Sequence, residues 1–160
     1  AEDGIRDPES CLVGSEMCIR DSAWAVDTVP GGWDRDSAMR LSVSKVDRLD
    51  EASLVYSSFP SIEESGWAPG FGPLLGKVWR DRGLGDFYGY MLVAEGAAEV
   101  MVEAELKIWD LAGPRAVMQH AGAQVTDIEG GEDMPDHGVL ATNGRLHQTI
   151  LDELAGAGRR

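Results

Sequence analysis

Short apolar stretches alternate with polar, glycine-rich segments along the chain, and their spacing predicts strands and helices in alternation. Strands are expected where apolar residues alternate or run together: 41–44, 54–56, 99–102, 124–127 and 139–141. Helices are expected where apolar residues recur at helical spacing: 74–82, 88–97, 110–120 and 145–154, with a single turn at 49–52. Residues 57–72 are rich in Ser, Gly and Pro, which predicts a loop. Strands that alternate with helices indicate an α/β fold.

The residues between Gly85 and Gly131 hold the strongest candidates for chemistry. Glu103 follows an apolar strand, and Asp110 follows a tryptophan seven residues later, at the expected start of a helix. Aspartate is a preferred N-cap, and the residues alone favour that structural role for Asp110. The unsatisfied N–H groups and partial positive charge of a helix N-terminus also suit a carboxylate that turns one oxygen towards a metal ion. Both roles use the same side chain.

This tract resembles the metal-binding half of the inositol monophosphatase superfamily. The Trp109–Asp110 step opens a helix, and a turn at 121–123 and a strand follow it. A further strand, a turn at 141–144 and an amphipathic helix close the chain, as is usual in the superfamily. The resemblance spans about residues 41–155 and implies the C-terminal half of a layered α/β sandwich. It also implies that Asp110 is a catalytic ligand of Mg²⁺ and that the substrate is a small-molecule phosphate monoester.

Hydrolysis of a phosphate monoester with Mg²⁺ needs several oxygen ligands and charge stabilisation on the phosphoryl oxygens. The resemblance assigns the other ligands to a Glu-Glu pair and an Asp-Pro-x-Asp-Gly-Thr motif. That motif is absent, and the acidic clusters at 34–36 and 63–64 lack the surrounding pattern. A single carboxylate binds Mg²⁺ weakly, because the ion keeps most of its water unless several oxygens converge. We therefore expect this chain to be inactive by itself.

The first 22 residues need separate treatment. They show neither helical nor strand periodicity, and they lack a secretory pattern. Back-translated, they resemble the two ends of a short-read sequencing adapter, so we expect residues 1–22 to be a non-native, disordered tract; a natural acidic tail is the alternative. Residues 23–160 are then expected to be the C-terminal part of a longer phosphatase domain. Both cysteines, Cys11 and Cys18, lie in the tract, so the remainder has no thiol, which suits the cytoplasm.

The chain is strongly acidic, with a formal net charge of −14. Residues 1–22 hold six of its 28 acidic and two of its 14 basic residues, so the remainder still carries −10. This charge argues against binding to a nucleic-acid backbone, which needs clustered Lys and Arg. No apolar run approaches the roughly 20 residues that cross a bilayer. We therefore expect a soluble protein with neither nucleic acid nor membrane as a partner.

The run from Arg82 to Tyr90 resembles the Gly-Asp-aromatic-Tyr-Gly-Tyr run of bacterial histidinol-phosphate phosphatases. Histidinol phosphate carries an ammonium and an imidazole, so carboxylates near its organic end would favour it over a neutral polyol. Asp86 and Glu103 are the candidates for these carboxylates. By position, Glu103 also matches the superfamily acid that contacts the substrate. The resemblance therefore implies hydrolysis of histidinol phosphate in histidine biosynthesis, with Asp86 and Glu103 as substrate-binding residues.

Other roles and functions stay open. The residues alone favour Asp86 as a helix N-cap and Glu103 as a solvated strand end. Arg82 is a third candidate substrate contact, although arginine in a last helical turn also compensates the helix dipole. The alternative functions are an inositol-1-phosphate phosphatase of the same superfamily and a noncatalytic acidic domain that acts through a partner. Members of the superfamily are often dimers, so a homodimer is open too.

Three further features shape the expectations. His120, His137 and His147 have no close metal-ligand spacing and are expected at the surface, which argues against zinc. Gly113-Pro114 and Gln119-His120 depart from the superfamily pattern, and they leave the start of the Asp110 helix open. Part of a larger domain should also expose apolar surface and a sheet edge, so we expect the chain to associate.

Overall fold

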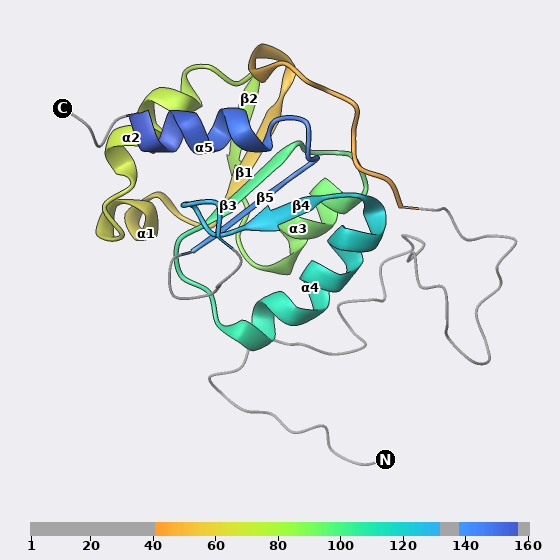
Figure 1. Ribbon diagram of the computed structural model, residues 1–160. Coiled ribbons are helices and arrows are strands. Elements are labelled where there is room, and N and C mark those ends of the chain that lie inside the picture. Colours follow the sequence, from red (N-terminus) through yellow and green to blue (C-terminus); the bar gives the residue numbers. More distant parts are fainter. Residues whose placement is uncertain (1–40, 132–137, 157–160) are drawn as a thin grey trace, which may run out of the picture.

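The computed structural model describes residues 41–131 and 138–156, which form a five-stranded mixed sheet with helices on both faces (Figure 1). The tract 1–22, the acidic cluster at 34–36 and His137 lie outside the described residues. The strands are Ser53–Tyr56 (β1), Arg80–Gly83 (β2), Val100–Glu103 (β3), Gln124–Thr126 (β4) and Val139–Thr142 (β5). Their order across the sheet is β2-β1-β3-β5-β4. β1, β2 and β3 run parallel, and β5 pairs antiparallel with β3 and β4.

Helices form a layer on each face of this sheet. They are Phe59–Glu64 (α1), Ala68–Leu75 (α2), Phe87–Ala94 (α3), Ile108–Ala121 (α4) and His147–Gly156 (α5), with a 3₁₀ turn at Leu49–Glu51 (η2). α2 packs against α5 on one face, and α3 packs against α4 on the other (Figure 1). The predicted α/β class is confirmed. None of the helices in the described ranges is long and apolar enough to cross a membrane.

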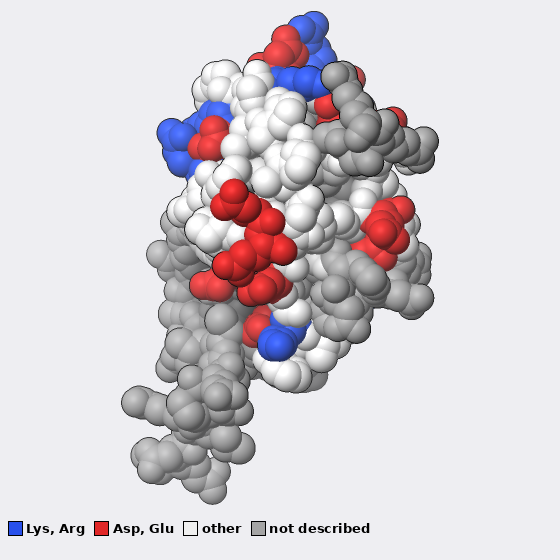
Figure 2. Space-filling model, turned by 90° about the vertical axis from the view of Figure 1, so that its left-hand side faces the viewer, with Lys and Arg blue, Asp and Glu red and all other residues white. Residues whose placement is uncertain are grey.

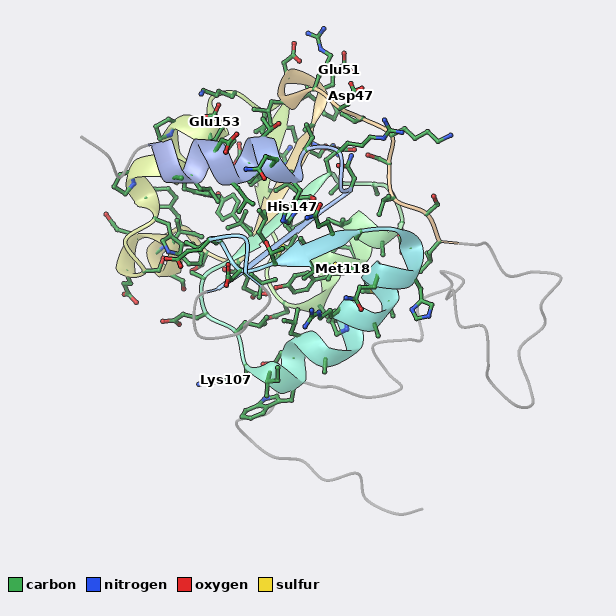
Figure 3. All side chains as sticks on the ribbon, viewed as in Figure 1. Asp47, Glu51, Lys107, Met118, His147 and Glu153 are labelled. Carbon is green, nitrogen blue, oxygen red and sulfur yellow. The ribbon has the colours of Figure 1, made fainter. Side chains whose placement is uncertain are left out.

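The strands fill a separate core on each face. In β1, Leu54 packs into the core under α1, α2 and α5, whereas Val55 packs into the core under α3 and α4. Because successive side chains of a strand point to opposite faces and both faces are covered, β1, β3 and β5 consist mainly of apolar residues. In Figure 3, Lys107 lies at the outer end of α4 and Met118 lies further along the helix. Met118 is fully buried in the core under α3 and α4.

The segment between β1 and β2 differs from the prediction. The loop expected at 57–72 is wrong, because α1 and the first part of α2 form there. The helix expected at 74–82 is also wrong, because α2 ends at Leu75 and residues 80–83 pair with β1 as β2. Gly70 shows how a glycine serves here within a helix: a Cβ at this position would lie 2.5 Å from the carbonyl oxygen of Leu154, so its absence lets α2 approach α5. Tertiary packing overrides local propensity in this segment.

The other expected elements are found close to their predicted bounds, with one exception. Residues 41–44 form no strand. They lie against the end of α4, where the Val43 N–H donates to the carbonyl oxygen of Ala121 at 3.1 Å. The turn expected at 49–52 is confirmed as η2.

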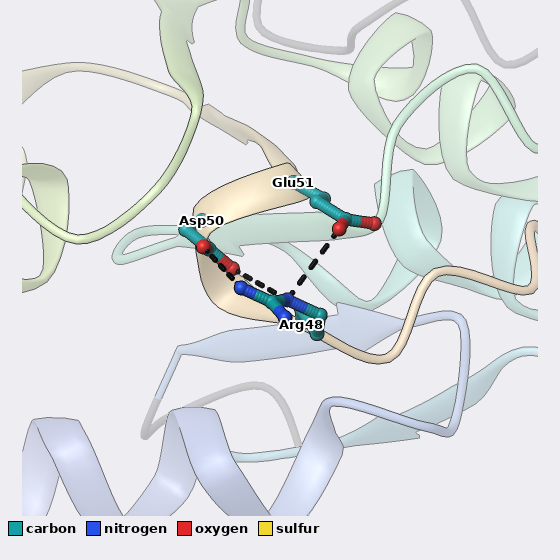
Figure 4. Close-up of polar contacts among 3 residues, drawn as sticks. All are labelled: Arg48, Asp50 and Glu51. Atoms are coloured by element: carbon teal, nitrogen blue, oxygen red, sulfur yellow. Dashed lines mark hydrogen bonds and ion pairs between the residues drawn. The ribbon is translucent and has the colours of Figure 1, made fainter.

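Charged side chains lie mainly on the surface of the described residues. Beside η2, Arg48 binds Asp50 at 2.6 Å and Glu51 at 3.4 Å (Figure 4). All three side chains are exposed, so these ion pairs contribute little to stability. Figure 2 shows a band of acidic side chains on one face, with the basic side chains of that face close to acidic ones. Such a face offers no basic stripe for a nucleic-acid backbone.

Apolar groups and sheet edges are also exposed among the described residues. The large exposed apolar side chains there are Phe59, Trp79, Leu84, Ile108 and Trp109. β2 and β4 lie at the two edges of the sheet. The predicted exposure of apolar surface and a sheet edge is therefore confirmed for this part of the chain. Association of the chain stays a prediction.

The expectation that His147 lies at the surface is wrong, because the side chain is 2% exposed and packs between α5 and the sheet (Figure 3). Its Nε2 lies 2.9 Å from Thr126 Oγ1, and its Nδ1 lies 3.0 Å from Thr142 Oγ1. The Thr126 hydroxyl donates to the carbonyl oxygen of Asp127, so it accepts from His147 Nε2–H. Nδ1 then accepts from Thr142. Burial lowers the pKa of His147 to about 4.

We predict that His147 makes the stability of the chain pH-dependent. Between about pH 6.5 and 4, the unfolded chain takes up a proton on His147 and the folded chain does not. This contribution to the free energy of unfolding is therefore full above pH 6.5 and is lost as the pH falls towards 4. Urea unfolding of wild type and His147→Asn at pH 5.0 and 7.5 tests this. The wild type should lose more stability than the variant on going to pH 5.0, and equal losses would contradict the prediction.

Candidate active site

Three parallel strands end on the same side of the sheet, and three of the four predicted site residues, Asp86, Glu103 and Asp110, lie near these ends. Ser57 follows β1, Asp86 lies three residues after β2, and Glu103 ends β3. Backbone hydrogen bonds hold the strand ends together, from Leu84 N–H to Tyr56 O at 2.8 Å and from Ser57 N–H to Val102 O at 3.2 Å. α3 and α4 begin beside these strand ends. The carboxyl ends of parallel strands are where α/β proteins place ligand sites.

Glu103 is buried at the end of β3, with 4% of its surface exposed. Its Oε2 accepts a hydrogen bond from the hydroxyl of Tyr90 on α3 at 2.6 Å. Burial, together with the negative charges of Asp86 and Asp110, raises the pKa of Glu103 to about 7. The Tyr90 hydroxyl and the Asp86 backbone act in the opposite direction, since they hydrogen-bond to the charged form. The structural alternative of a solvated strand end is therefore wrong for Glu103.

Asp110 lies in the first turn of α4, and the helix begins earlier than predicted. Lys107 is the N-cap, so Asp110 is not. Its Oδ1 is buried and has no hydrogen-bond partner in the structure. A buried carboxylate oxygen without a partner is costly unless it binds a cation or donor. This oxygen therefore fits a metal ligand better than it fits a helix cap.

Asp86 is the N-cap residue of α3, yet its side chain makes no capping hydrogen bond. Its backbone has φ +61° and ψ −165°, a region that is essentially restricted to glycine. The backbone hydrogen bond with the Glu103 carboxylate forms at this residue. The expected N-cap position is thus confirmed, whereas capping does not explain the choice of aspartate. Strain of this kind is concentrated at functional sites.

We predict that Asp86→Gly is more stable than Asp86→Ala. Both variants remove the carboxylate, but only glycine relieves the backbone, whose strain is on the order of 1–3 kcal/mol. Glycine loses about 0.5–1 kcal/mol more than alanine through chain entropy, which leaves a net difference of about 1 kcal/mol. Urea unfolding of the two variants measures it. If the alanine variant is the more stable, the backbone at residue 86 is not strained.

Arg82 does not join this cluster. The residue lies on β2 and not in a last helical turn, so the predicted location is wrong. Its side chain is exposed, and Nη1 donates to the neighbouring Asp81 carbonyl oxygen at 2.6 Å. Among the described residues, no contact joins it to Asp86, Glu103 or Asp110. A role in binding substrate stays a prediction.

Two further residues near Asp86, Glu103 and Asp110 carry functional groups that the sequence pattern did not indicate. Tyr90 is fully buried, and its hydroxyl contacts Glu103. Ser57 has a buried Oγ without a partner at the end of β1. Tyr90 lies one helical turn after Asp86 in the Gly-Asp-Phe-Tyr-Gly-Tyr run, which was the available signal. Gly89 lets α3 pack directly on β3, because a Cβ there would clash with the Met101 sulfur.

The described residues contain no complete metal centre. None of their His, Cys, Asp and Glu side chains form a group of three that could hold a metal ion. A pocket of about 670 Å³ lies elsewhere, and neither Asp86, Glu103 nor Asp110 lines it. It is formed by α5, β4 and the turn between α1 and α2. Asp86, Glu103 and Asp110 therefore form a strand-end cluster that is anionic and partly buried. One of its carboxylate oxygens, Asp110 Oδ1, has no hydrogen-bond partner and is available to a cation.

Known proteins are similar to this chain in sequence and in fold. The sequence profile of the inositol monophosphatase family matches residues 31–158. Histidinol-phosphatase of Streptomyces coelicolor is 41% identical over 133 residues, which are 82% of this chain and 50% of that protein. Histidinol-phosphatase of Mycobacterium tuberculosis is 43% identical over 120 residues, 72% of this chain and 44% of that protein. The chain thus spans about half the length of the curated relatives it matches.

Solved structures agree on the fold. The extragenic suppressor protein suhB from Bartonella henselae superposes with a TM-score of 0.65 at 24% identity, over 72% of this chain and 46% of that one. An IMPase from Thermotoga maritima superposes with a TM-score of 0.64 at 21% identity, over 75% of this chain and 46% of that one. At these identities the likeness concerns the fold alone. The profile match over most of the sequence shows that this chain belongs to the inositol monophosphatase family.

Proposed function

We propose that this chain forms part of a Mg²⁺-dependent phosphatase that hydrolyses histidinol phosphate to histidinol and phosphate. One observation carries the proposal: two carboxylates, Asp86 and Glu103, lie together beside a third, Asp110, that has an unpartnered oxygen. Three carboxylates close to the ends of parallel strands suit a substrate with a positively charged organic group and a phosphate that needs a metal cation. The two relatives named histidinol-phosphatase support this substrate.

The proposed roles divide between the two ends of the substrate. Asp110 would bind Mg²⁺ through Oδ1, and the bound ion would neutralise charge on the phosphoryl oxygens and make its water more acidic. Glu103 and Asp86 would bind the ammonium or imidazolium group at the organic end. A charge-assisted hydrogen bond to a buried carboxylate is among the stronger polar contacts, and a neutral polyol lacks it.

The remaining metal ligands are proposed to come from the part of the relatives that this chain does not match. A single carboxylate among the described residues would hold Mg²⁺ weakly, because several oxygens must replace the water of the ion. We therefore expect the 160-residue chain to release no phosphate by itself. Histidine biosynthesis would place the complete enzyme in the cytoplasm.

A fused enzyme tests this proposal. Residues 41–160 are joined to the part of the Streptomyces coelicolor histidinol-phosphatase that the chain does not match. We expect the fused enzyme, and not the 160-residue chain, to release phosphate from histidinol phosphate with Mg²⁺ and to restore growth of a histidine auxotroph that lacks this phosphatase. The complete Streptomyces coelicolor protein is the positive control. A stably folded fusion that hydrolyses neither histidinol phosphate nor inositol 1-phosphate would favour a noncatalytic role.

Inositol 1-phosphate is the second candidate substrate, because the family profile that matches the chain is named for inositol monophosphatase. In that case Asp86 and Glu103 would meet hydroxyl groups and not a cation. The fused enzyme distinguishes the two, since a preference for the inositol ester would keep the phosphatase and reject the proposed substrate.

A further inference from the structure

We infer that Tyr90 is a specificity-determining positioning residue that acts through Glu103, holding this carboxylate ready for the cationic end of the substrate. The inference rests on the proposed function, because it concerns how the same site selects its substrate. It assigns a role to a residue that lies behind the predicted substrate contacts.

A short hydrogen bond joins Tyr90 to Glu103. Tyr90 is fully buried on α3, and its hydroxyl donates to Glu103 Oε2 at 2.6 Å. A distance this short is typical of a hydrogen bond from a hydroxyl group to a carboxylate. Gly89 leaves room for the Met101 side chain of β3, so the helix that carries Tyr90 lies against the strand that carries Glu103. The carboxylate is therefore held from one side by a rigid donor.

Packing alone does not require a hydroxyl group at residue 90. Tyr90 packs with apolar residues of the α3/α4 core, such as Val93 and Leu111, where a phenylalanine ring would fill the same space. A buried hydroxyl needs a partner, and the partner of this one is a carboxylate. The polar group thus serves Glu103 and not the fit of the ring.

The contact with Tyr90 opposes the repulsion that neighbouring carboxylates exert on Glu103. The charged groups that face it are Asp86, at the start of α3, and Asp110, on α4, and both repel its negative charge. The Tyr90 hydroxyl and the backbone hydrogen bond at Asp86 oppose that repulsion. Without the Tyr90 hydroxyl, Glu103 would lose a fixed hydrogen-bond donor to Oε2. Its side chain would then be less firmly held in the orientation that faces the substrate. Only a substrate that uses the negative charge of Glu103 should sense this loss.

Kinetics of Tyr90→Phe in the fused enzyme test the inference, with histidinol phosphate and inositol 1-phosphate as substrates. We expect kcat/KM for histidinol phosphate to fall about ten-fold, mainly through a higher KM, and that for inositol 1-phosphate to change less than about two-fold. In a Glu103→Gln background, Tyr90→Phe should leave the ratio of the two substrates unchanged, because the residue acts through Glu103. Tyr56→Phe is the matched control. Its ring packs in the other core and its hydroxyl bonds to Asp81, so the substrate ratio should not change.

Each other outcome decides against the inference. Equal losses on both substrates would show a merely structural role for Tyr90. A further change of the substrate ratio in the Glu103→Gln background would show that Tyr90 acts independently of Glu103. Thermal unfolding of Tyr90→Phe checks that the variant is folded. If the unsubstituted fused enzyme prefers inositol 1-phosphate or turns over neither substrate, the proposed function fails and the inference fails with it; if it prefers histidinol phosphate and Tyr90→Phe leaves the substrate ratio unchanged, the inference alone fails.

Discussion

Replacing Asp110 with asparagine should lower Mg²⁺-dependent phosphate release by the fused enzyme at least about 100-fold. Loss of a group that only supports a metal ligand typically costs 10- to 100-fold, and loss of the ligand itself should cost more. The amide has a similar shape but no charge, so it binds a hard cation poorly. Steady-state assays over a range of Mg²⁺ concentrations measure the effect, which higher Mg²⁺ should reverse only in part.

The same variant separates a functional role from a structural one. The Asp110 Oδ1 atom has no partner in the structure, so its replacement removes no hydrogen bond of that atom from the metal-free fold, and the favourable contribution that is lost is the interaction with the helix dipole. We expect Asp110→Asn to change the metal-free stability of the chain by less than about 1 kcal/mol. In the fused enzyme, Mg²⁺ should raise the Tm of the wild type and not that of the variant. A large loss of metal-free stability would instead show that Asp110 supports the helix.

Replacing Glu103 with glutamine should lower kcat/KM for histidinol phosphate by about 10- to 100-fold, the range expected for a hydrogen bond to a charged group. The inositol ester should be affected far less. Glu105→Gln is the matched control, because Glu105 is exposed just beyond the end of β3, and its substitution should leave both substrates unchanged. Equal effects of Glu103→Gln on the two substrates would contradict recognition of a cation by Glu103.

Glu103 should also make the free energy of unfolding depend on pH in a known direction. Its pKa in the folded chain is about 7, above its ordinary value of about 4.5. Between these values the folded chain binds the proton more tightly than the unfolded chain, so this contribution to stability falls as the pH rises from 4.5 to 7. Glutamine mimics the protonated form. Glu103→Gln should therefore gain stability relative to wild type as the pH rises through this window, and a constant difference would contradict the raised pKa.

Much of the fold could be predicted because its strands have a simple composition. β1, β3 and β5 are short apolar runs covered on both faces, and such runs read as strands without knowledge of their partners. The segment 57–83 could not be predicted in the same way. Its helices contain proline and glycine, and β2 is a polar edge strand whose formation depends on pairing with β1. Local propensity points the other way at both places.

The candidate site was predictable in its residues and not in its geometry. The resemblance to the superfamily marked Glu103 and Asp110 as candidates, because the residues alone favoured a solvated strand end and a helix cap. The burial of Glu103, the strained backbone of Asp86 and the hydroxyl of Tyr90 depend on how α3 packs on β3. Tyr90 looks like an ordinary core aromatic in the sequence, since its helical spacing is that of an apolar position. His147 was misplaced because the two threonines that satisfy it lie on β4 and β5, and the sequence does not show that these strands pair.

The ratio of kcat/KM for histidinol phosphate to that for inositol 1-phosphate, measured with Mg²⁺ in one preparation of the fused enzyme, tests the central claim most directly. A carboxylate cluster that selects a cationic substrate predicts a ratio of at least about ten. A ratio near or below one would contradict the selection of a cation by Asp86 and Glu103, whatever the absolute rates.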